Sequence, residues 1–409
     1  MTDATGRSFL SYRRSRSAEA ALLIAAQHDH GVPTWQDQRD LNEVPTSDEL
    51  RRILEDRLTA NALLWITPDV ETSDVIRKIE VPGILKRVRA GDGFFLVPVC
   101  AGGISYQRAG EVVDQQLSID NLSDWNLRKV LGDPIGSDEA AQIVHHVLAR
   151  RIQAVHRQLD ASLPLRITLH TRARPAFQPG TALMFDWSER FSGRETEPST
   201  WEQILLPALR EAASSIRLHG GGRAIIASGL PSIPAATALG VAFLAQGGQS
   251  ISWSQYTPGR PEQLWSIDAP REAAGFTAVT TERDVAGKDL AVLVSVAENV
   301  EPAFSQTPKG ALPAFRAITR IYHPDQRRFD ITSAGQAADI AAMVIEAIRV
   351  AREGYRPVRT IHLFMAVPVG LAMLIGQGLN TFGDVQTYEH IPADGVGIYH
   401  GAAKLLPSI

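Results

Sequence analysis

A carboxylate and a short basic segment near the N-terminus have side chains suited to chemistry. Glu80 lies within the segment WITPDVETSDVIRKIE, and Tyr12, Arg13 and Arg14 follow an apolar stretch that begins at Ser8. A fixed carboxylate can stabilise the positive charge that develops on a sugar when the bond to its leaving group breaks. Guanidinium groups can hold a pyrophosphate, and a tyrosine ring can stack on another ring. Together these side chains would suit chemistry on a sugar that carries a pyrophosphate.

Each of these residues also has a purely structural interpretation. Glu80 would then be a solvated helix residue that pairs with Arg77 or Lys78, because most charged helix residues are solvated. The segment Tyr12–Arg14 would be a basic surface turn, since arginine is common on surfaces. The residue types alone leave both interpretations open.

The surrounding sequence alternates between apolar strands and amphipathic helices. The expected strands are Ser8–Tyr12, Val32–Trp35, Ala62–Thr67 and Phe94–Val99, and the expected helices are Ser17–His28, Asp48–Leu58 and Glu139–Leu159. This alternation predicts an α/β fold with a parallel, doubly wound sheet. Loops at the carboxyl ends of such strands bind ligands, and Tyr12–Arg14 would occupy one of these ends.

A repeated pattern organises the second half of the chain. The segment Ala224–Gly240 has a counterpart 136 positions later, Thr360–Gly376, and each reads as an apolar strand, a proline-containing turn and a helix of small residues. In this alignment Gly240 corresponds to Gly376. Two such copies suggest two half-sites that face one ligand. The alternative is two unrelated strand–helix units in one sheet.

The repeat extends beyond these two segments. Strands are expected at Arg166–His170 and Leu183–Trp187, and helices at Trp201–Leu218 and Ala337–Glu353. The strand Leu290–Ala297 resembles Thr181–Ser188 in kind, because both are apolar and end in a polar loop. Two similar units are therefore predicted to be fused in one chain.

Residues near these strands are candidates for contacting a ligand. Aromatic rings offer stacking faces, hydroxyls donate hydrogen bonds and lysine pairs with phosphate. The candidates of these three kinds are Trp187, Phe304, Phe364, Ser188, Ser228 and Lys309, and Arg190 and Arg194 are further candidates for contacting phosphate. Phe364 has a competing interpretation as a core residue of its strand. For Arg190 and Arg194 the competing interpretation is that they are solvated loop residues.

Composition excludes several classes of protein. The 409 residues carry a formal net charge of −4, which provides no global field for a nucleic-acid polymer. Cys100 is the only cysteine, which excludes internal disulfides and cysteine-based metal clusters. Prolines interrupt the uncharged stretch Ala224–Gly259, so no membrane span is expected. No signal-peptide core opens the chain, and a cytoplasmic location is expected.

Residues 1–160 resemble a TIR domain of the NAD-cleaving kind. The resemblance rests on FLSYRR at Phe9–Arg14, on VPTWQD at Val32–Asp37 and on the segment that contains Glu80. It implies a flavodoxin-like parallel sheet and a catalytic role for Glu80. It also implies that Asp37 and the loop after it border the NAD pocket. Together with Tyr12, Arg13 and Arg14 at the strand end, Asp37 and Trp35 are the predicted NAD-binding residues, and Trp35 has a competing interpretation as a core residue. The family commonly has tryptophan four residues before the glutamate, where this chain has Ile76.

Residues 161–409 resemble a SAVED domain, a fusion of two CARF-like Rossmann subunits that senses cyclic oligonucleotides. The segment RTIHLFMAVPVGLAMLIGQGL at Arg359–Leu379 carries this resemblance. It implies two halves, at about residues 161–285 and 286–409. It also implies a role in the antiphage systems known as CBASS, in which a ligand sensor is fused to an effector.

These observations lead to the hypothesis of a cyclic-oligonucleotide-activated NAD+ hydrolase, a NAD+ nucleosidase. NAD+ would be the substrate, cyclic oligoadenylate, in particular cyclic tri-adenylate, would be the activator, and no cofactor or metal is expected. Because the loop Gln36–Ser47 would border the NAD pocket, a neighbouring TIR domain could fix it, and ligand-driven assembly into filaments is expected. The alternative hypothesis is a non-catalytic TIR adaptor controlled by a nucleotide sensor.

Overall fold

The computed structural model describes residues 1–35, 46–112, 127–244, 249–257, 259–325, 328–392, 395 and 397–406, without the side chains of Thr46 and Lys309. The chain forms two compact units. The first comprises Met1–Leu163, Ala176–Phe185 and Ser214–Gly221, and the second comprises Pro164–Pro175, Asp186–Ala213 and Gly222–Ile409. The predicted domain bounds, 1–160 and 161–409, stay a prediction.

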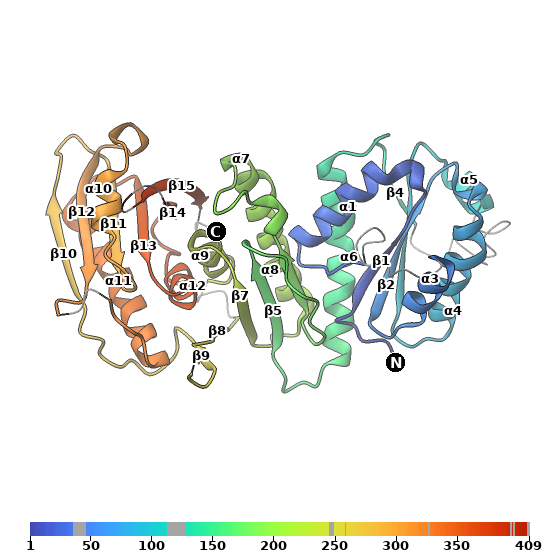
Figure 1. Cartoon of the computed structure of the whole chain (residues 1–409), viewed down its shortest axis with the longest axis horizontal. Coiled ribbons are helices and arrows are strands. Elements are labelled where there is room, and N and C mark those ends of the chain that lie inside the picture. The colour runs from blue at the N-terminus through green and yellow to red at the C-terminus, as the bar shows by residue number, and fades with distance from the viewer. Residues whose placement is uncertain are drawn as a thin grey trace. The chain divides into compact units, whose positions relative to one another are not determined.

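Strands and helices alternate through most of the chain (Figure 1). The strands are β1 Arg7–Ser11, β2 Thr59–Ile66, β3 Phe95–Cys100, β4 Arg128–Lys129, β5 Leu165–His170, β6 Leu183–Asp186, β7 Ile225–Leu230, β8 Ile251–Gln255, β9 Gln263–Trp265, β10 Thr277–Glu282, β11 Asp289–Ser295, β12 Phe315–Tyr322, β13 Thr360–Ala366, β14 Asp384–Ile391 and β15 Ile398–Leu405. The helices are α1 Ser17–Asp29, α3 Thr46–Glu55, α4 Val81–Arg89, α5 Tyr106–Glu111, α6 Ser137–Gln158, α7 Pro198–Thr200, α8 Leu206–His219, α9 Ile233–Ala242, α10 Glu301–Gln306, α11 Ala334–Gly354 and α12 Val369–Gln377.

The first unit is built on a parallel sheet in the order β1-β2-β3-β4. Helices α1 and α6 lie on one face of this sheet, and α3 and α4 lie on the other (Figure 1). The predicted strand Val32–Trp35 is reduced to one parallel bridge between Thr34 and Ser8. The Ser8 amide and carbonyl both bond to this segment, so it lies on the side of β1 away from β2. With it, the chain order across the sheet is 2-1-3-4-5, the flavodoxin-like pattern.

Apolar side chains of the sheet and of α3 and α4 form one core in this unit. Every residue of β2 is buried, and the strand reads TANALLWI. Continuous apolar runs of this kind are typical of parallel strands that are covered on both faces. Leu54 of α3, Ile84 of α4 and Leu64 of β2 all belong to this cluster.

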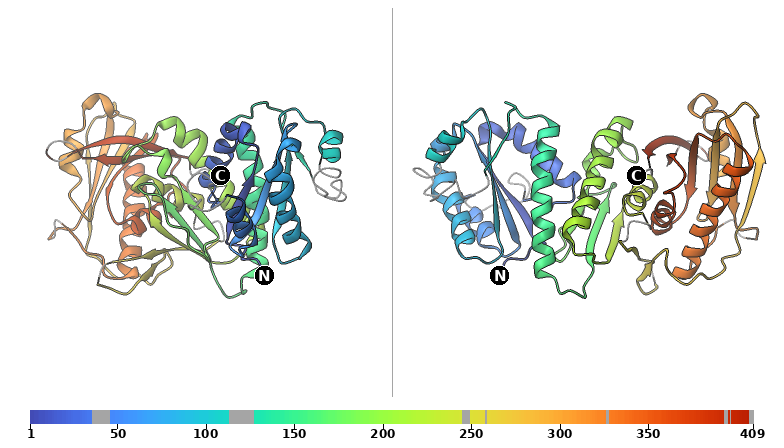
Figure 2. Two further views of the ribbon diagram at one scale, coloured as in Figure 1. Left: turned by 45° about the vertical axis from the view of Figure 1, so that its right-hand side comes forward. Right: turned by 180° about the vertical axis from the view of Figure 1, so that it is seen from behind.

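Two further sheets have the same strand pattern. Their orders are β6-β5-β7-β8-β9 and β10-β12-β11-β13-β14-β15. In each, a parallel arrangement ends in one antiparallel strand, β9 or β15. The second sheet differs by the added antiparallel edge strand β10, and α11 lies against one of its faces (Figure 2). The predicted duplication is therefore present in the topology.

One predicted correspondence within the repeat is wrong. The segments Leu290–Ala297 and Thr181–Ser188 were expected to be equivalent because both are apolar strands that end in polar loops. In the structure β11 is an inner strand between β12 and β13, whereas β6 lies at the edge of its sheet. The equivalent of β11 is β5, and the equivalent of β6 is β12. Local composition does not distinguish an inner strand from its neighbour.

The two repeated helices, α9 and α12, contact each other through their glycines. A Cβ atom added to Gly240 would lie 2.1 Å from the Met373 carbonyl oxygen and 2.9 Å from the Gly376 Cα. A Cβ atom added to Gly376 would lie 2.3 Å from the Thr237 carbonyl oxygen. Residues that correspond in the repeat thus touch each other, as residues on a two-fold axis do. The two halves of the second unit are related by an approximate two-fold rotation that passes near these glycines.

No helix among the residues described above is both long and apolar enough to cross a membrane. Within the same residues, no three His, Cys, Asp or Glu side chains are grouped in a way that could hold a metal ion.

Candidate active site and ligand pocket

Glu80 lies at the carboxyl end of the first sheet. It is the last residue of a single π-helical turn, Ile76–Glu80, that leads directly into α4. Its side chain is 8% exposed, and its Oε2 accepts a hydrogen bond of 2.5 Å from the Ser11 hydroxyl. A distance this short is typical of a hydroxyl bonded to a carboxylate. Glu80 is therefore held by a specific contact, unlike a solvated helix residue.

The place of this contact in the sheet favours a binding site. Ser11 is the last residue of β1, and Glu80 follows β2. The strand order reverses at β1, because the chain continues first to Thr34 on one side and then to β2 on the other. Ligands of open α/β sheets bind in the crevice at such a reversal. π-Helical turns are also frequent at functional sites.

The basic segment Tyr12–Arg14 begins at the same end of β1. Tyr12 is half-buried, Arg14 is exposed, and the Arg13 Nε lies 3.6 Å from the Asp69 Oδ2. That Nε is buried and has no hydrogen-bond partner among the described residues. Burial acts to raise the pKa of Asp69, but hydrogen bonds from Ser15 and Thr67 lower it below its usual value. An ionised Asp69 thus holds Arg13 at the edge of the sheet.

Trp35 has a packing role in this unit. Its Nε1 donates a hydrogen bond of 3.2 Å to the Thr59 hydroxyl, and the Arg7 guanidinium lies 4.1 Å from its ring centroid. The indole also packs against the core described above. Contact with NAD+ stays a prediction for Trp35. Asp37, the other residue predicted from this segment, lies outside the described residues, as do residues 36–45 of the predicted loop.

We expect replacement of Ser11 by alanine to lower the turnover of the reaction at Glu80 by about 10- to 100-fold. The loss of one donor that positions a catalytic charge has effects of this order. The Michaelis constant should change little, because Ser11 is fully buried and contacts the carboxylate rather than the substrate. Steady-state kinetics of the full chain measure both quantities. Ser162→Ala, which removes an exposed hydroxyl that donates to the Asp160 carboxylate, is the matched control, and an equal loss in both variants would argue against positioning by Ser11.

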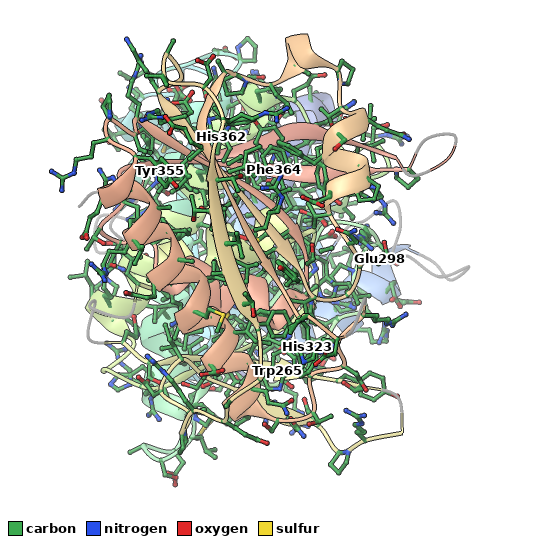
Figure 3. All side chains as sticks on the ribbon, turned by 90° about the vertical axis from the view of Figure 1, so that its left-hand side faces the viewer. Trp265, Glu298, His323, Tyr355, His362 and Phe364 are labelled. Atoms are coloured by element: carbon green, nitrogen blue, oxygen red, sulfur yellow. The ribbon has the colours of Figure 1, made fainter. Side chains whose placement is uncertain are left out.

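The predicted stacking residues of the second unit are engaged by other aromatic rings. Trp187 is completely buried and meets Trp201 edge-on, with ring centroids 6.0 Å apart. Phe364 is completely buried on β13, where Figure 3 labels it beside His362, and it stacks on Tyr388 at 4.1 Å. Because both ring faces lie in the protein core, the expectation that these residues stack on a ligand is corrected.

Phe304 is packed in the same core. Its ring meets Phe364 edge-on at 4.9 Å and lies 5.9 Å from the Phe315 ring. It is only partly buried, but these contacts make it a packing residue in this structure. The side chain of Lys309 lies outside the described part of the chain.

The two predicted serines lie near the carboxyl ends of strands in the first half. Ser188 is half-buried after β6, and its hydroxyl donates a hydrogen bond of 2.5 Å to the Asp186 carboxylate. Ser228 is half-buried on β7 and is the register partner of Thr168 on β5. Their positions agree with a polar site at this end of the sheet, and ligand contact stays a prediction for both.

A charged pocket lies where the two halves of the second unit meet, and of its charged residues the sequence predicted only Arg194 as a ligand-binding candidate. Glu389 on β14 is 5% exposed, and its Oε1 lies 3.9 Å from the Arg172 guanidinium of the first half. Arg194 donates a hydrogen bond of 3.2 Å to the His390 carbonyl, and Glu195 bonds to His400. The cavity beside Glu389 is lined by Phe191, Arg194, Glu195, Thr196, Trp201, Ser232, Pro234, Glu389, His400, Gly401 and Ala402.

The positive and negative charges of this pocket do not cancel completely. Burial raises the pKa of Glu389 to about 7, while Arg172 and Arg194 act to lower it and Glu195 adds to the rise. Ser232 at the pocket wall is the N-cap of α9, so the positive end of that helix also faces the cavity region. Two guanidinium groups and a helix N-terminus would attract an anion to this region, although the cavity itself is about 20 Å³ and has room for about one water molecule.

A larger cavity of about 510 Å³ lies elsewhere in the second half. It is formed at the carboxyl ends of β11 and β12 and includes His323, which Figure 3 labels. Its Arg320 is paired with Glu301, so the charges that face this cavity are largely compensated. Its lining therefore does not favour an anion.

Comparison with known families identifies most of the second unit. Residues 208–405 match the family described as SAVED, the SMODS-associated and fused to various effectors sensor domain. These residues form a SAVED domain. The SAVED match covers both repeated segments and the α9–α12 contact between them. No curated protein matches the chain.

Among solved structures, the chain is similar to SAVED/CARF-domain-containing Cap4 receptors. The Acinetobacter baumannii receptor with 2'3'3'-cAAA is 15% identical, with 95% of this chain and 97% of that chain covered and a TM-score of 0.48. The same receptor with 3'3'3'-cAAA is 14% identical, with coverage of 95% and 98% and a TM-score of 0.49. The Moraxella osloensis receptor is 13% identical, with coverage of 96% and 100% and a TM-score of 0.44.

Proposed function

We propose that the chain is an NAD+ nucleosidase that a cyclic oligonucleotide activates through the SAVED domain, as an effector of CBASS antiphage defence. The first unit would break the bond between nicotinamide and ribose. Nicotinamide leaves with the bonding electron pair, and water then adds to the ribose and releases a proton, so the products are nicotinamide, ADP-ribose and a proton.

The observation that carries the catalytic part is the buried Ser11–Glu80 pair at the reversal of the strand order. A carboxylate fixed at this end of the sheet would stabilise positive charge on a ribose. Arg13, whose Nε has no hydrogen-bond partner in the described part of the chain, is available at the same strand end for a pyrophosphate. NAD+ contains both a ribose bonded to nicotinamide and a pyrophosphate.

The SAVED domain and the pocket around Arg172 and Arg194 support the sensing part. A cyclic oligonucleotide presents several phosphates and several bases in a compact ring. The guanidinium groups and the α9 N-terminus would attract phosphates to this region, although its cavity of about 20 Å³ is too small to enclose one, and the region lies between two similar but unequal halves. Cyclic tri-adenylate is the first activator to test, because a ring of three has no strict two-fold symmetry to match equal halves.

The full chain should consume NAD+ when cyclic tri-adenylate is added and leave it intact when linear tri-adenylate is added. Chromatography measures NAD+ and nicotinamide, while light scattering follows particle size in the same samples. We expect the particles to grow with the ring and the activity to rise more than linearly with protein concentration, since we propose that assembly couples sensor and effector. If NAD+ stayed intact although cyclic tri-adenylate was bound, the proposed NAD+ nucleosidase activity would be wrong. Full activity in a ligand-bound monomer would overturn the assembly mechanism alone.

A further inference from the structure

The strand β10 leaves one backbone edge of its sheet open. It is the outermost strand of that sheet, and its other edge pairs with β12 (Figure 1). In an antiparallel pair, alternate residues of an edge strand turn their N–H and C=O groups away from the neighbouring strand. No strand of the described residues bonds to these groups of β10. An open edge of this kind can accept another β-strand.

β10 lacks the features that usually protect an edge strand. Its sequence, TAVTTE, contains no proline and no lysine, and its register with β12 has no bulge. Each residue of β10 is exposed or half-exposed, and Val279 in the middle is 40% exposed. Two other edge strands are protected, because β9 has only three residues and β15 carries Lys404. We therefore expect a partner strand to cover β10.

A second copy of β10 fits this edge. A two-fold axis perpendicular to the sheet makes the two copies antiparallel, and regular hydrogen bonding then requires one residue to lie opposite its own copy. With Val279 on the axis, Thr277 lies opposite Thr281. Ala278 lies opposite Thr280 in the same arrangement. Most of these residues are β-branched, and cross-strand pairs of such residues stabilise sheets.

The charges along β10 allow this pairing. Glu282 is the only charged residue of the strand, and it lies beyond the paired stretch Thr277–Thr281. Its carboxylate is already paired with Arg316 of β12. No like charges therefore meet within this stretch, where they would destabilise the pair.

The groove beside β10 supports a second copy as the partner. β10 and α11 line a cavity of about 470 Å³, with Ala278 and Thr280 on the strand side. On the helix side Val350 is 53% exposed. A second copy would continue the sheet past Ala278 and Thr280 and would bury part of this apolar surface, which is favourable.

We propose that two copies of the chain pair through β10, about a two-fold axis at Val279, and form one continuous sheet. This dimer needs no cyclic oligonucleotide, so the inference goes beyond the proposed function and does not rest on it. The dimer also differs from the assembly that the ring drives, because a two-fold contact closes on itself and cannot grow.

Cysteine substitutions test the pairing and its register in the full chain. Opposite residues of an antiparallel pair have Cα atoms about 4.5–5.5 Å apart, a distance that a disulfide can bridge. Val279→Cys should therefore form a covalent dimer under mild oxidation without any ring. The native Cys100 is buried. Thr281→Cys is the matched control, because four residues along the strand place it about 14 Å from its own copy.

The Thr281→Cys variant should cross-link at least about tenfold more slowly than Val279→Cys, since only Val279 meets its own copy at a high effective concentration. Equal rates in the two variants would overturn the proposed register. The absence of a covalent dimer from Val279→Cys would overturn the dimer itself.

A charge at the same position should prevent the dimer. Val279→Lys would place two lysines opposite each other, and like charges there are destabilising. Light scattering over a dilution series from about 100 μM should give a mass that approaches twice 44.5 kDa for the wild type and stays near 44.5 kDa for Val279→Lys. A series is needed because one strand pair buries less than the roughly 1,600 Å² of a standard interface.

Val285→Lys is the matched control for the charge, because Val285 is 77% exposed and lies after the end of β10. It should dimerise as the wild type does. Thermal unfolding of both variants checks that they are folded, and the two cysteine variants decide the matter if Val279→Lys is not. A wild type that stays monomeric over the whole series, or a Val279→Lys variant that is folded and still dimeric, would overturn the proposal.

Discussion

Glu80→Gln is expected to reduce NAD+ cleavage at saturating activator by at least about 1000-fold, while ligand binding to the SAVED domain stays unchanged. The amide has nearly the same shape as the carboxylate and can still accept the Ser11 hydrogen bond. What it lacks is the negative charge that opposes the positive charge on ribose in the transition state. Since that interaction is made mainly in the transition state, turnover should fall far more than affinity for NAD+.

Nicotinamide release under activated conditions measures the effect of Glu80→Gln, and calorimetry with cyclic tri-adenylate checks the sensor. Glu71→Gln is the matched control, because Glu71 lies on the same segment but pairs with Arg108 at the surface. The Glu71→Gln variant should retain NAD+ cleavage. Wild-type turnover in Glu80→Gln would show that another residue supplies the catalytic charge.

Gly240→Ala is expected to destabilise the SAVED domain by about 3 kcal/mol and to abolish ligand binding. The added Cβ atom would lie 2.1 Å from the Met373 carbonyl oxygen, and backbone cannot move aside as a flexible side chain does. Overpacking of a close contact usually costs about 1–3 kcal/mol, occasionally more. Separation of α9 and α12 would also change the distance between the two halves that form the charged pocket.

Thermal unfolding should register the Gly240→Ala change as a fall in the midpoint of about 6–12 °C. Gly354→Ala provides the control, because Gly354 ends α11 and a Cβ atom there meets no atom within 4 Å. Alanine in place of glycine within a helix ordinarily stabilises by about 0.5–1 kcal/mol. The two substitutions should therefore act with opposite signs. A neutral Gly240→Ala would mean that the two helices are not in backbone contact.

Local sequence patterns predicted most of the helices and strands, because these elements have a strong hydrophobic periodicity. The repeat placed β7 with α9 and β13 with α12, and the structure confirms both pairs within a few residues. The structure of the short stretch Val32–Trp35 was harder to predict, because an edge segment with few apolar residues forms only one bridge. Glu80 could be selected as a candidate because a family resemblance distinguished it from other helix carboxylates.

Contacts between distant parts of the chain could not be predicted. Trp187 follows a strand, which suggested exposure, but Trp201 covers it. Arg194 contacts His390 across 196 positions, and no local pattern indicates that the two halves bring them together. Arg151 is a further example, since it is completely buried and donates to the carbonyls of Thr5, Gly6 and Ala182. A charged residue on an amphipathic helix is expected to be solvated.

The contact between Gly240 and Gly376 also affects how the protein can work at low abundance. In a homodimer, two halves related by a two-fold axis separate when the protein is diluted below its dissociation constant. Here a covalent connection keeps the equivalent halves at a high effective concentration, whatever the number of copies in the cell. The stoichiometry is fixed at one complete pocket per chain, and a damaged half cannot be replaced by exchange with an intact one.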